Sequence, residues 1–393
     1  MSRRPSSRPR ATLLGLLALV VAACSGPVLA NPPAGHPVVT PAPAPTARPA
    51  DPQPVVLPRD DAPHDRLTEW WYYTGHLSDK AGGRWGFEFV IFRAERGGFP
   101  VSWASHLALT DEAGGRFHYA QRSEVGPQVN LATGADGGPA FAFGIRGIDI
   151  GDPSTLTRAP WSMTGLDGVD TLLAEATAPE SSGDAVDGFG LSLGLRATKP
   201  PVLHDGDGYV DFGPAGGSYY DSRTAMTAAG TVTVGSRELA VEGFAWFDHQ
   251  WGDFIAVGAG GWDWFAVNLD DGTDVTLSLV RAADGSYPLV YGTLVDGDGA
   301  ARNLGADAFT VEVDAEWTSP TTGATYPAGW TITVPGEDMA IELRPTVPHQ
   351  ELDTRATTGV VYWEGSQRVT ATRAGVMLGG RGYVELTGYA AGP

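Results

Sequence analysis

Short stretches that alternate apolar and polar residues recur from Glu69 to the end of the chain, with glycine-rich turns between them. Alternation with a period of two predicts β-strands that pack one face against a core. Turn pairs such as Asp271-Gly272, Asp284-Gly285 and Asp296-Gly297 have the spacing of β-hairpins. No amphipathic segment predicts a helix longer than two turns, so the pattern indicates an all-β sandwich or barrel. Strands are expected at Arg84–Arg93, Val275–Val280, Thr331–Val334 and Gly382–Leu386.

An aromatic pattern occurs twice along the chain. The run Trp70–Tyr73 is similar to Trp262–Phe265, 192 positions later, and Tyr219–Asp221 is similar to Tyr362–Glu364. Because the matches follow in the same order, we interpret the folded part as two copies of one β unit. The predicted domains are residues 64–250 and 251–393.

The N-terminal residues have the pattern of an export signal. Residues 1–23 carry four arginines and then the apolar run Ala11–Ala23. Thirteen helical residues span about 20 Å, less than the ~30 Å of a membrane's hydrocarbon core. The small residues before Cys24 resemble a lipobox, which implies lipidation of Cys24 and an exported protein anchored in the cell envelope. The alternative is an ordinary signal sequence with an incidental cysteine. Residues 24–63 are proline-rich and predict an extended linker.

Charge and cysteine content narrow the classes of partner. The formal net charge is −20, which disfavours nucleic acid and anionic membrane surfaces as partners. The only membrane contact that we expect is therefore the lipid anchor. With a single cysteine, the chain cannot form an intramolecular disulfide.

Several motifs resemble those of the AttH and carotenoid 1,2-hydratase (CrtC) family, a group that includes proteins called predicted secreted hydrolases. They follow the family's order and cover nearly all of residues 60–390. The most specific are T-E-W-W-Y-Y-T-G-H-L (68–77), W-F-D-H-Q-W-G (246–252), G-W-D-W-F (261–265) and Y-V-E-L-T-G-Y (383–389).

The resemblance implies a tandem of lipocalin-like β-barrel or sandwich domains, with a ligand cavity near their junction. It also implies hydration of a carotenoid or shaping of a polyketide cyclisation. One motif departs from the family, because Gln250-Trp251-Gly252 stands where carotenoid hydratases usually have Glu-Trp-Ser. A neutral amide thus replaces a carboxylate, which puts the hydratase activity in question.

Acidic residues lie among tryptophans between the two copies. A carboxylate beside aromatic walls loses solvation, which raises its pKa and lets it donate a proton. Aromatic faces also stabilise a carbocation. Strand alternation places Asp248 and Gln250 on one face, with His249 and Trp251 on the other. The alternative is that the acids are structural and accept hydrogen bonds from turns or indoles. The candidate catalytic residues are Asp263, Asp248 and His249.

Aromatic residues around these acids are candidates for ligand binding, and the alternative for them is ordinary core and rim packing. The isolated His106, His204 and His349 are interpreted as core or turn histidines. The candidate ligand-binding residues are Glu69, Trp70, Trp71, Tyr73, Trp246, Trp251, Trp262 and Trp264.

Two hypotheses about function follow. The first is acid–base hydration or cyclisation of a hydrophobic small molecule, an isoprenoid or a polyketide, without a cofactor. The second is a non-catalytic lipocalin-type binder or carrier of such a molecule. No spacing of ligating residues indicates a metal site. The string Gly190–Gly194 matches G-x-S-x-G, but apolar alternation continues through Ser192, which indicates a strand and no nucleophile. The hydrolase name of the group therefore finds no support in the residues.

Overall fold

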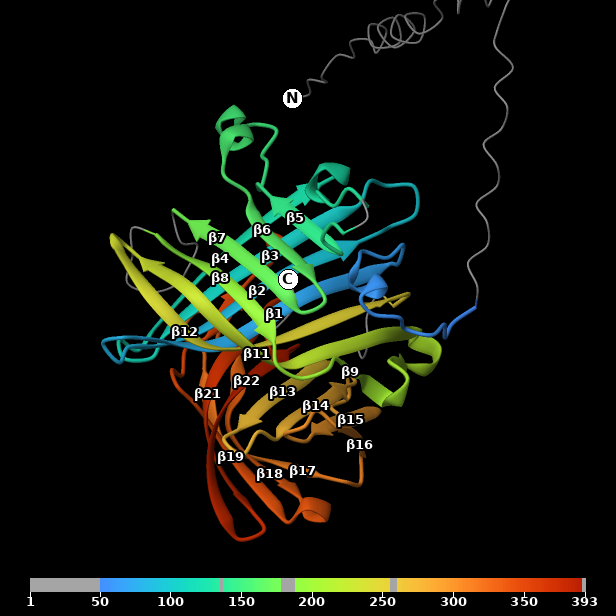
Figure 1. The fold of residues 1–393 in the computed structure, drawn as a ribbon, viewed down its shortest axis with the longest axis vertical. Helices are drawn as coiled ribbons and strands as arrows, with labels where there is room; N and C mark the ends of the chain where they lie inside the picture. Colours follow the sequence, from blue (N-terminus) through green and yellow to red (C-terminus); the bar gives the residue numbers. More distant parts are fainter. Residues whose placement is uncertain (1–49, 135–136, 178–187, 255–259, 391–393) are drawn as a thin grey trace, which may run out of the picture. The chain divides into compact units, whose positions relative to one another are not determined.

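The computed structural model describes residues 50–134, 137–177, 188–254 and 260–390. Pro52–Pro393 forms one compact unit, shown in Figure 1. Over the described residues its regular structure consists of β-strands and short 3-10 helices, so the all-β prediction is confirmed. No helix in this part of the chain is long and apolar enough to cross a membrane. The expected signal sequence, Cys24 and most of the expected linker lie outside the described residues.

The strands form two antiparallel sheets that follow each other along the chain (Figure 1). Those of the first sheet are β1 (Thr68–Asp79), β2 (Arg84–Ala94), β3 (Ser102–Asp111), β4 (Arg116–Val125), β5 (Phe141–Ile145), β6 (Trp161–Leu166), β7 (Val169–Ala176), β8 (Phe189–Ala197), β9 (Val202–Leu203), β10 (Tyr209–Asp211), β11 (Gly217–Val234) and β12 (Arg237–Gly252). The G-x-S-x-G string lies inside β8, a continuous strand, as predicted.

The second sheet begins at Gly261. Its strands are β13 (Gly261–Leu269), β14 (Asp274–Arg281), β15 (Leu289–Val295), β16 (Ala301–Gly305), β17 (Thr310–Thr318), β18 (Thr325–Val334), β19 (Met339–Pro345), β20 (Glu351–Asp353), β21 (Val361–Arg373) and β22 (Val376–Thr387). The 3-10 helices are η2 (Arg59–Asp61), η3 (Pro127–Val129), η4 (Pro153–Thr157), η5 (His204–Gly206), η6 (Gly213–Ala215) and η7 (Pro335–Glu337).

The two sheets share one strand order. The path β4-β3-β2-β1-β12-β11-β8-β7-β6 has its counterpart in β16-β15-β14-β13-β22-β21-β19-β18-β17. The register agrees as well, because Glu69 pairs with Arg93 and the equivalent Gly261 pairs with Arg281. The aromatic runs after Glu69 and Gly261 therefore occupy equivalent places. The boundary between domains at residues 250 and 251 stays a prediction.

The second sequence match is displaced by one residue. Asp221 lies opposite His249, and Trp363 lies opposite Leu386. His249 and Leu386 are themselves equivalent by register, so Asp221 corresponds to Trp363 and not to Glu364. A shift of one residue turns a side chain to the opposite face of a sheet. Asp221 and Glu364 consequently point into different regions.

Each sheet curls around its own hydrophobic core. Trp71 and Trp161 are fully buried in the first core, and Trp330 and Trp363 are fully buried in the second. Burying one large apolar side chain stabilises a fold by about 1.5–3 kcal/mol. A third cluster joins the outer faces of the two sheets, with Tyr72, Val90 and Trp246 from the first and Trp264, Ala266 and Tyr383 from the second.

Part of the expected linker belongs to the folded unit. Asp61 is 1% exposed, and both its carboxylate oxygens accept hydrogen bonds from Arg223, at 3.1 and 3.0 Å. The indole of Trp71 also donates to the carbonyl oxygen of Asp61, at 3.0 Å. This stretch buries single side chains and forms no strand, so its sequence does not alternate between apolar and polar residues. A search for hydrophobic periodicity therefore does not identify it as part of the fold.

Candidate active site

The structure divides the candidate residues among three regions. Inside the first sheet lie Glu69, Trp71, Tyr73, His249 and Trp251. In the layer between the two sheets lie Trp70, Trp246, Asp248, Trp262 and Trp264. Asp263 lies inside the second sheet, at the position equivalent to that of Trp71. Asp248 and Asp263 therefore do not face a common site.

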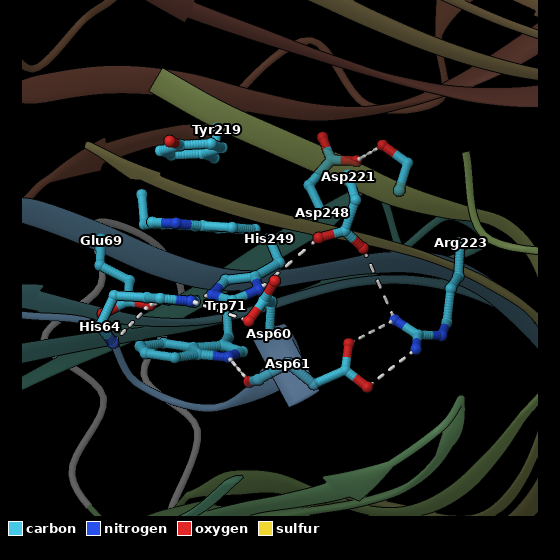
Figure 2. Close-up of polar contacts among 12 residues, drawn as sticks. Asp60, Asp61, His64, Glu69, Trp71, Tyr219, Asp221, Arg223, Asp248 and His249 are labelled. Carbon is cyan, nitrogen blue, oxygen red and sulfur yellow. Dashed lines mark hydrogen bonds and ion pairs between the residues drawn. The ribbon is translucent and has the colours of Figure 1, made fainter. Parts of the chain in front are cut away.

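His249 is the centre of the first region (Figure 2). Its ring is fully buried between Trp71 and Trp251, with ring centroids 4.7 and 4.5 Å away. Its Nε2 lies 3.0 Å from Oε1 of Glu69. Burial disfavours the charged imidazolium and lowers the pKa of His249, although Glu69 opposes the shift. His249 is thus held as a neutral base.

Glu69 is fully buried and connects His249 to His64. The ring of His64 places Nδ1 2.7 Å from Oε1 of Glu69, and its backbone N–H donates to Oε2 at 2.9 Å. Burial opposes ionisation, but the contacts with His249 and His64 outweigh it and hold the pKa of Glu69 below its usual value. His64 also stacks on Trp251 at 4.2 Å, with the rings almost parallel.

Asp221 faces the other side of His249. Its Oδ1 lies 3.7 Å from Nδ1 of His249, and its Oδ2 lies 3.7 Å from Nη1 of Arg223. Asp221 is fully buried, and neither of its oxygens has a hydrogen-bond partner among the described residues. Burial raises the pKa of Asp221 well above its usual value, although Arg223 opposes the shift. The neutral, protonated form of Asp221 fits this environment better than the carboxylate, because no group donates a hydrogen bond to it among the described residues.

The pair formed by Asp221 and His249 has the properties of an acid and a base. Their surroundings push the two pKa values in opposite directions, so that the acid keeps its proton and the base stays neutral. Aromatic rings of Trp71, Phe247 and Trp251 surround the base. This arrangement can give and take a proton beside faces that stabilise positive charge.

Asp248, on the opposite strand face, is held as a hydrogen-bond acceptor. Tyr220 donates to Oδ2 at 2.6 Å, the Trp246 indole donates to Oδ1 at 2.6 Å, and Ser222 donates to the same Oδ1. Burial raises the pKa of Asp248 to about 6, and the three donors oppose the shift. These contacts favour the structural interpretation, in which Asp248 fixes the layer between the sheets.

Asp263 is also paired. Arg281 lies 3.1 Å from Oδ1, and the Tyr389 hydroxyl donates at 3.0 Å, while Tyr287 donates at 3.3 Å to Oδ2. Burial raises the pKa of Asp263, against the opposing charge of Arg281. Arg281 donates a hydrogen bond to Asp263, whereas Arg223 lies 3.7 Å from Asp221 and donates none to it. The carboxylate form is therefore favoured more at Asp263, which makes Asp221 the better candidate for a proton donor.

Two clefts lie outside this region, beside the junction of the sheets. One, of about 300 Å³, is lined among others by Trp246 and Tyr383. The other, of about 430 Å³, shares His76, Phe244 and Arg381 with it. Neither is lined by Asp221 or His249. The ligand cavity expected near the junction of the two copies stays a prediction.

Sequence reasoning missed His64, Asp61, Asp221 and Arg223. Strand register places Asp221 opposite His249. Asp61 and His64 come from the segment before β1 and reach the site through Arg223 and Glu69. The donor atoms of His64, Glu69 and His249 lie within 4.8 Å of one another, an arrangement that can hold a metal ion. The isolated His106 and His204 are buried with hydrogen-bond partners on both ring nitrogens, as expected for core histidines.

Comparisons with known proteins support the architecture. Residues 48–389 match the AttH-like family. The dehydratase AsqC of Emericella nidulans is 23% identical over 317 residues, which cover 72% of this chain and 84% of AsqC. An AttH structure from Nitrosomonas europaea superposes with a TM-score of 0.68 and 28% identity, over 88% of this chain and 100% of that one. Kievitone hydratase from Nectria haematococca superposes with a TM-score of 0.59 and 16% identity, over 85% and 93%. The chain therefore belongs to the AttH-like family.

Proposed function

We propose that this protein catalyses acid–base hydration, dehydration or a related cyclisation of an unsaturated hydrophobic small molecule, an isoprenoid or a polyketide. In the direction of hydration, Asp221 donates a proton to the substrate, and His249, oriented by Glu69, accepts a proton from the attacking water. The observation that carries the proposal is the buried Asp221, which has no hydrogen-bond donor and faces an unpartnered nitrogen of a buried histidine. The names of two relatives, a dehydratase and a hydratase, agree with this class of reaction.

Exposed apolar side chains near the end of the first sheet suit a hydrophobic substrate. By register, Val125 of β4 lies level with Thr68 of β1, from which β3 and β2 separate it. Val125 is 58% exposed, and Phe99 in the neighbouring β2–β3 turn is 77% exposed. Large apolar side chains exposed together are a common mark of a binding surface.

The reaction is tested by incubating the purified protein with candidate polyenes in H₂¹⁸O and measuring label in the product. The wild type is expected to incorporate ¹⁸O. Asp221→Asn keeps size but cannot deliver the proton, so we expect its turnover to fall by about 10²–10⁴-fold. Its ligand affinity, measured by fluorescence of the nearby tryptophans, should change only a few-fold.

The binder hypothesis predicts a different result, because a carrier leaves a bound polyene chemically unchanged. Once a ligand that binds is known, absence of label with the wild type would refute catalysis. Asp248→Asn is the matched variant on the opposite strand face. If it lost turnover while Asp221→Asn kept it, the proton donor would be Asp248.

We also infer that the protein is exported and lipid-anchored through Cys24, on the sequence pattern alone. Labelled palmitate should enter the wild-type protein in cells. Cys24→Ser should abolish the labelling, since no other cysteine is present. Labelling of the variant at the wild-type level would disprove the lipid anchor.

A further inference from the structure

Three donor atoms converge at the start of β1 and the end of β12 (Figure 2). His64 Nδ1 and His249 Nε2 lie 2.7 and 3.0 Å from the same oxygen, Oε1 of Glu69. All three atoms lie within 4.8 Å of one another. Two imidazole nitrogens and one carboxylate are a ligand set of Zn²⁺ and related divalent ions, which leave their remaining positions to water.

The surroundings of the histidines add independent support. Nδ1 of His249 faces Oδ1 of Asp221 at 3.7 Å, and Nε2 of His64 faces Oδ1 of Asp60 at 4.0 Å. Histidines that ligate metals commonly turn their second nitrogen toward a carboxylate, which fixes the ring and its tautomer. If His249 ligates through Nε2, its proton sits on Nδ1 and points at Asp221. Oδ1 of Asp221, which has no hydrogen-bond partner among the described residues, then faces a donor.

Access and rigidity also suit a cation. The side chain of His64 is 22% exposed, whereas those of Glu69 and His249 are fully buried. Stacking on Trp251 fixes the His64 ring, and Trp71 packs against the His249 ring. A tetrahedral ion with bonds of about 2.0–2.1 Å separates its ligand atoms by roughly 3.3 Å. The two contacts at Glu69, now 2.7 and 3.0 Å, would lengthen by roughly 0.3–0.6 Å. The two imidazole nitrogens already lie within 4.8 Å of each other.

We propose that His64, Glu69 and His249 bind a divalent transition-metal ion of the Zn²⁺ type, with Asp221 and Asp60 as the outer partners of the two histidines. Binding is independent of the reaction proposed above. Its effect on catalysis rests on that reaction: with the ion on Nε2, the Nδ1 of His249 carries a proton and cannot accept one. The ion therefore inhibits the acid–base chemistry.

Binding is tested on the purified full chain after treatment with a chelator. Co²⁺, titrated without substrate, should give one saturable site with d–d absorption of a low-coordinate ion, and Zn²⁺ should displace it. Glu69→Gln and His64→Gln should each lower Co²⁺ affinity by at least 100-fold. Asp221→Asn should lower it by about 10–100-fold, as expected for an outer partner. His349 lies between β19 and β20 of the second sheet, so His349→Gln should bind Co²⁺ as tightly as the wild type does.

Each result decides a different point. Absence of saturable Co²⁺ binding by the wild type, or equal affinity in folded His64→Gln, would overturn the site and indicate a hydrogen-bond relay instead. His64 is partly exposed, so this variant keeps the test open if Glu69→Gln fails to fold. If ¹⁸O incorporation occurs and Zn²⁺ does not slow it, inhibition is overturned. If binding occurs without any reaction, the reaction alone fails.

Discussion

Removing one partner of a buried ion pair in the first sheet should cost more stability than removing one partner of a pair on the surface. The side chains of Arg223 and Asp61 are 2% and 1% exposed and form a bidentate pair. Arg223→Met leaves Asp61 buried without a partner, so we expect the free energy of unfolding to fall by about 3–5 kcal/mol. Arg302→Met is the matched control, because its pairs with Asp296 and Glu337 are partly exposed and should each contribute less than about 1 kcal/mol. Equal losses in urea unfolding would show that the buried pair has no special role.

The site around His249 could not be predicted from local sequence alone, because its residues come from distant parts of the chain. Alternation correctly separates Asp248 from His249, because neighbouring residues of one strand point to opposite faces. It does not predict that Asp221 lies opposite His249, since that depends on the pairing of β11 with β12. His64 lies outside any strand and carries no periodic signal. The predicted aromatic setting of His249 was therefore accessible, while its acid and its second histidine were not.

At the scale of strands, close packing limits which residues β1 accepts. Gly75 lies in the middle of β1, paired with both β2 and β12. A Cβ on Gly75 would lie 2.3 Å from the carbonyl oxygen of Phe244 and 2.5 Å from the ring of Phe87. We expect Gly75→Ala to destabilise the protein by about 1–3 kcal/mol through overpacking. Gly98→Ala has open space around the new Cβ and is the control. Thermal denaturation compares the two, and a Gly75→Ala midpoint equal to that of the control would contradict the packing argument.

Strand prediction succeeded where no proline interrupts a run rich in apolar residues. The expected strands 84–93 and 275–280 agree with β2 and β14 to within one residue at each end. The expected strand 331–334 covers only the last part of β18, because Pro327 and Gly329 disfavour a strand in its first part. There the pairing with β17 also shifts register at Ala315. Tertiary pairing thus extends strands beyond what their own residues favour.

At the scale of the whole folded unit, buried acids join the two sheets. Tyr72 of the first sheet donates to Glu364 of the second at 2.8 Å, and Tyr362 of the second donates to Glu88 of the first at 2.8 Å. Glu88 and Glu364 are each 0–1% exposed, and each has one oxygen without a hydrogen-bond partner in the described part of the chain. Burial raises the pKa of Glu88 to about 8 and that of nearby Glu385 to about 7, and it raises that of Glu364 well above its usual value. Below pH about 7, therefore, the sheets meet through acids that are largely protonated.

This junction predicts that stability falls as pH rises. Each acid keeps its proton in the folded state but ionises in the unfolded chain above pH ~4.5, so its contribution is complete below that pH. The contribution is lost as pH rises toward the folded pKa, at about 7 for Glu385 and about 8 for Glu88. One such proton corresponds to a slope of about 1.4 kcal/mol per pH unit. Asp248, with a pKa of about 6, adds to the slope mainly at lower pH, whereas Asp221, whose pKa is also raised, adds to it in the same range. The difference in slope between the wild type and a Glu88 variant, measured by urea unfolding between pH 6.5 and 8, therefore gives the contribution of Glu88. Glu88→Gln should flatten the decline of the free energy of unfolding in this window. Glu238→Gln, on the exposed surface, should leave the decline unchanged. Equal slopes in the two variants would mean that Glu88 is already ionised in the folded protein.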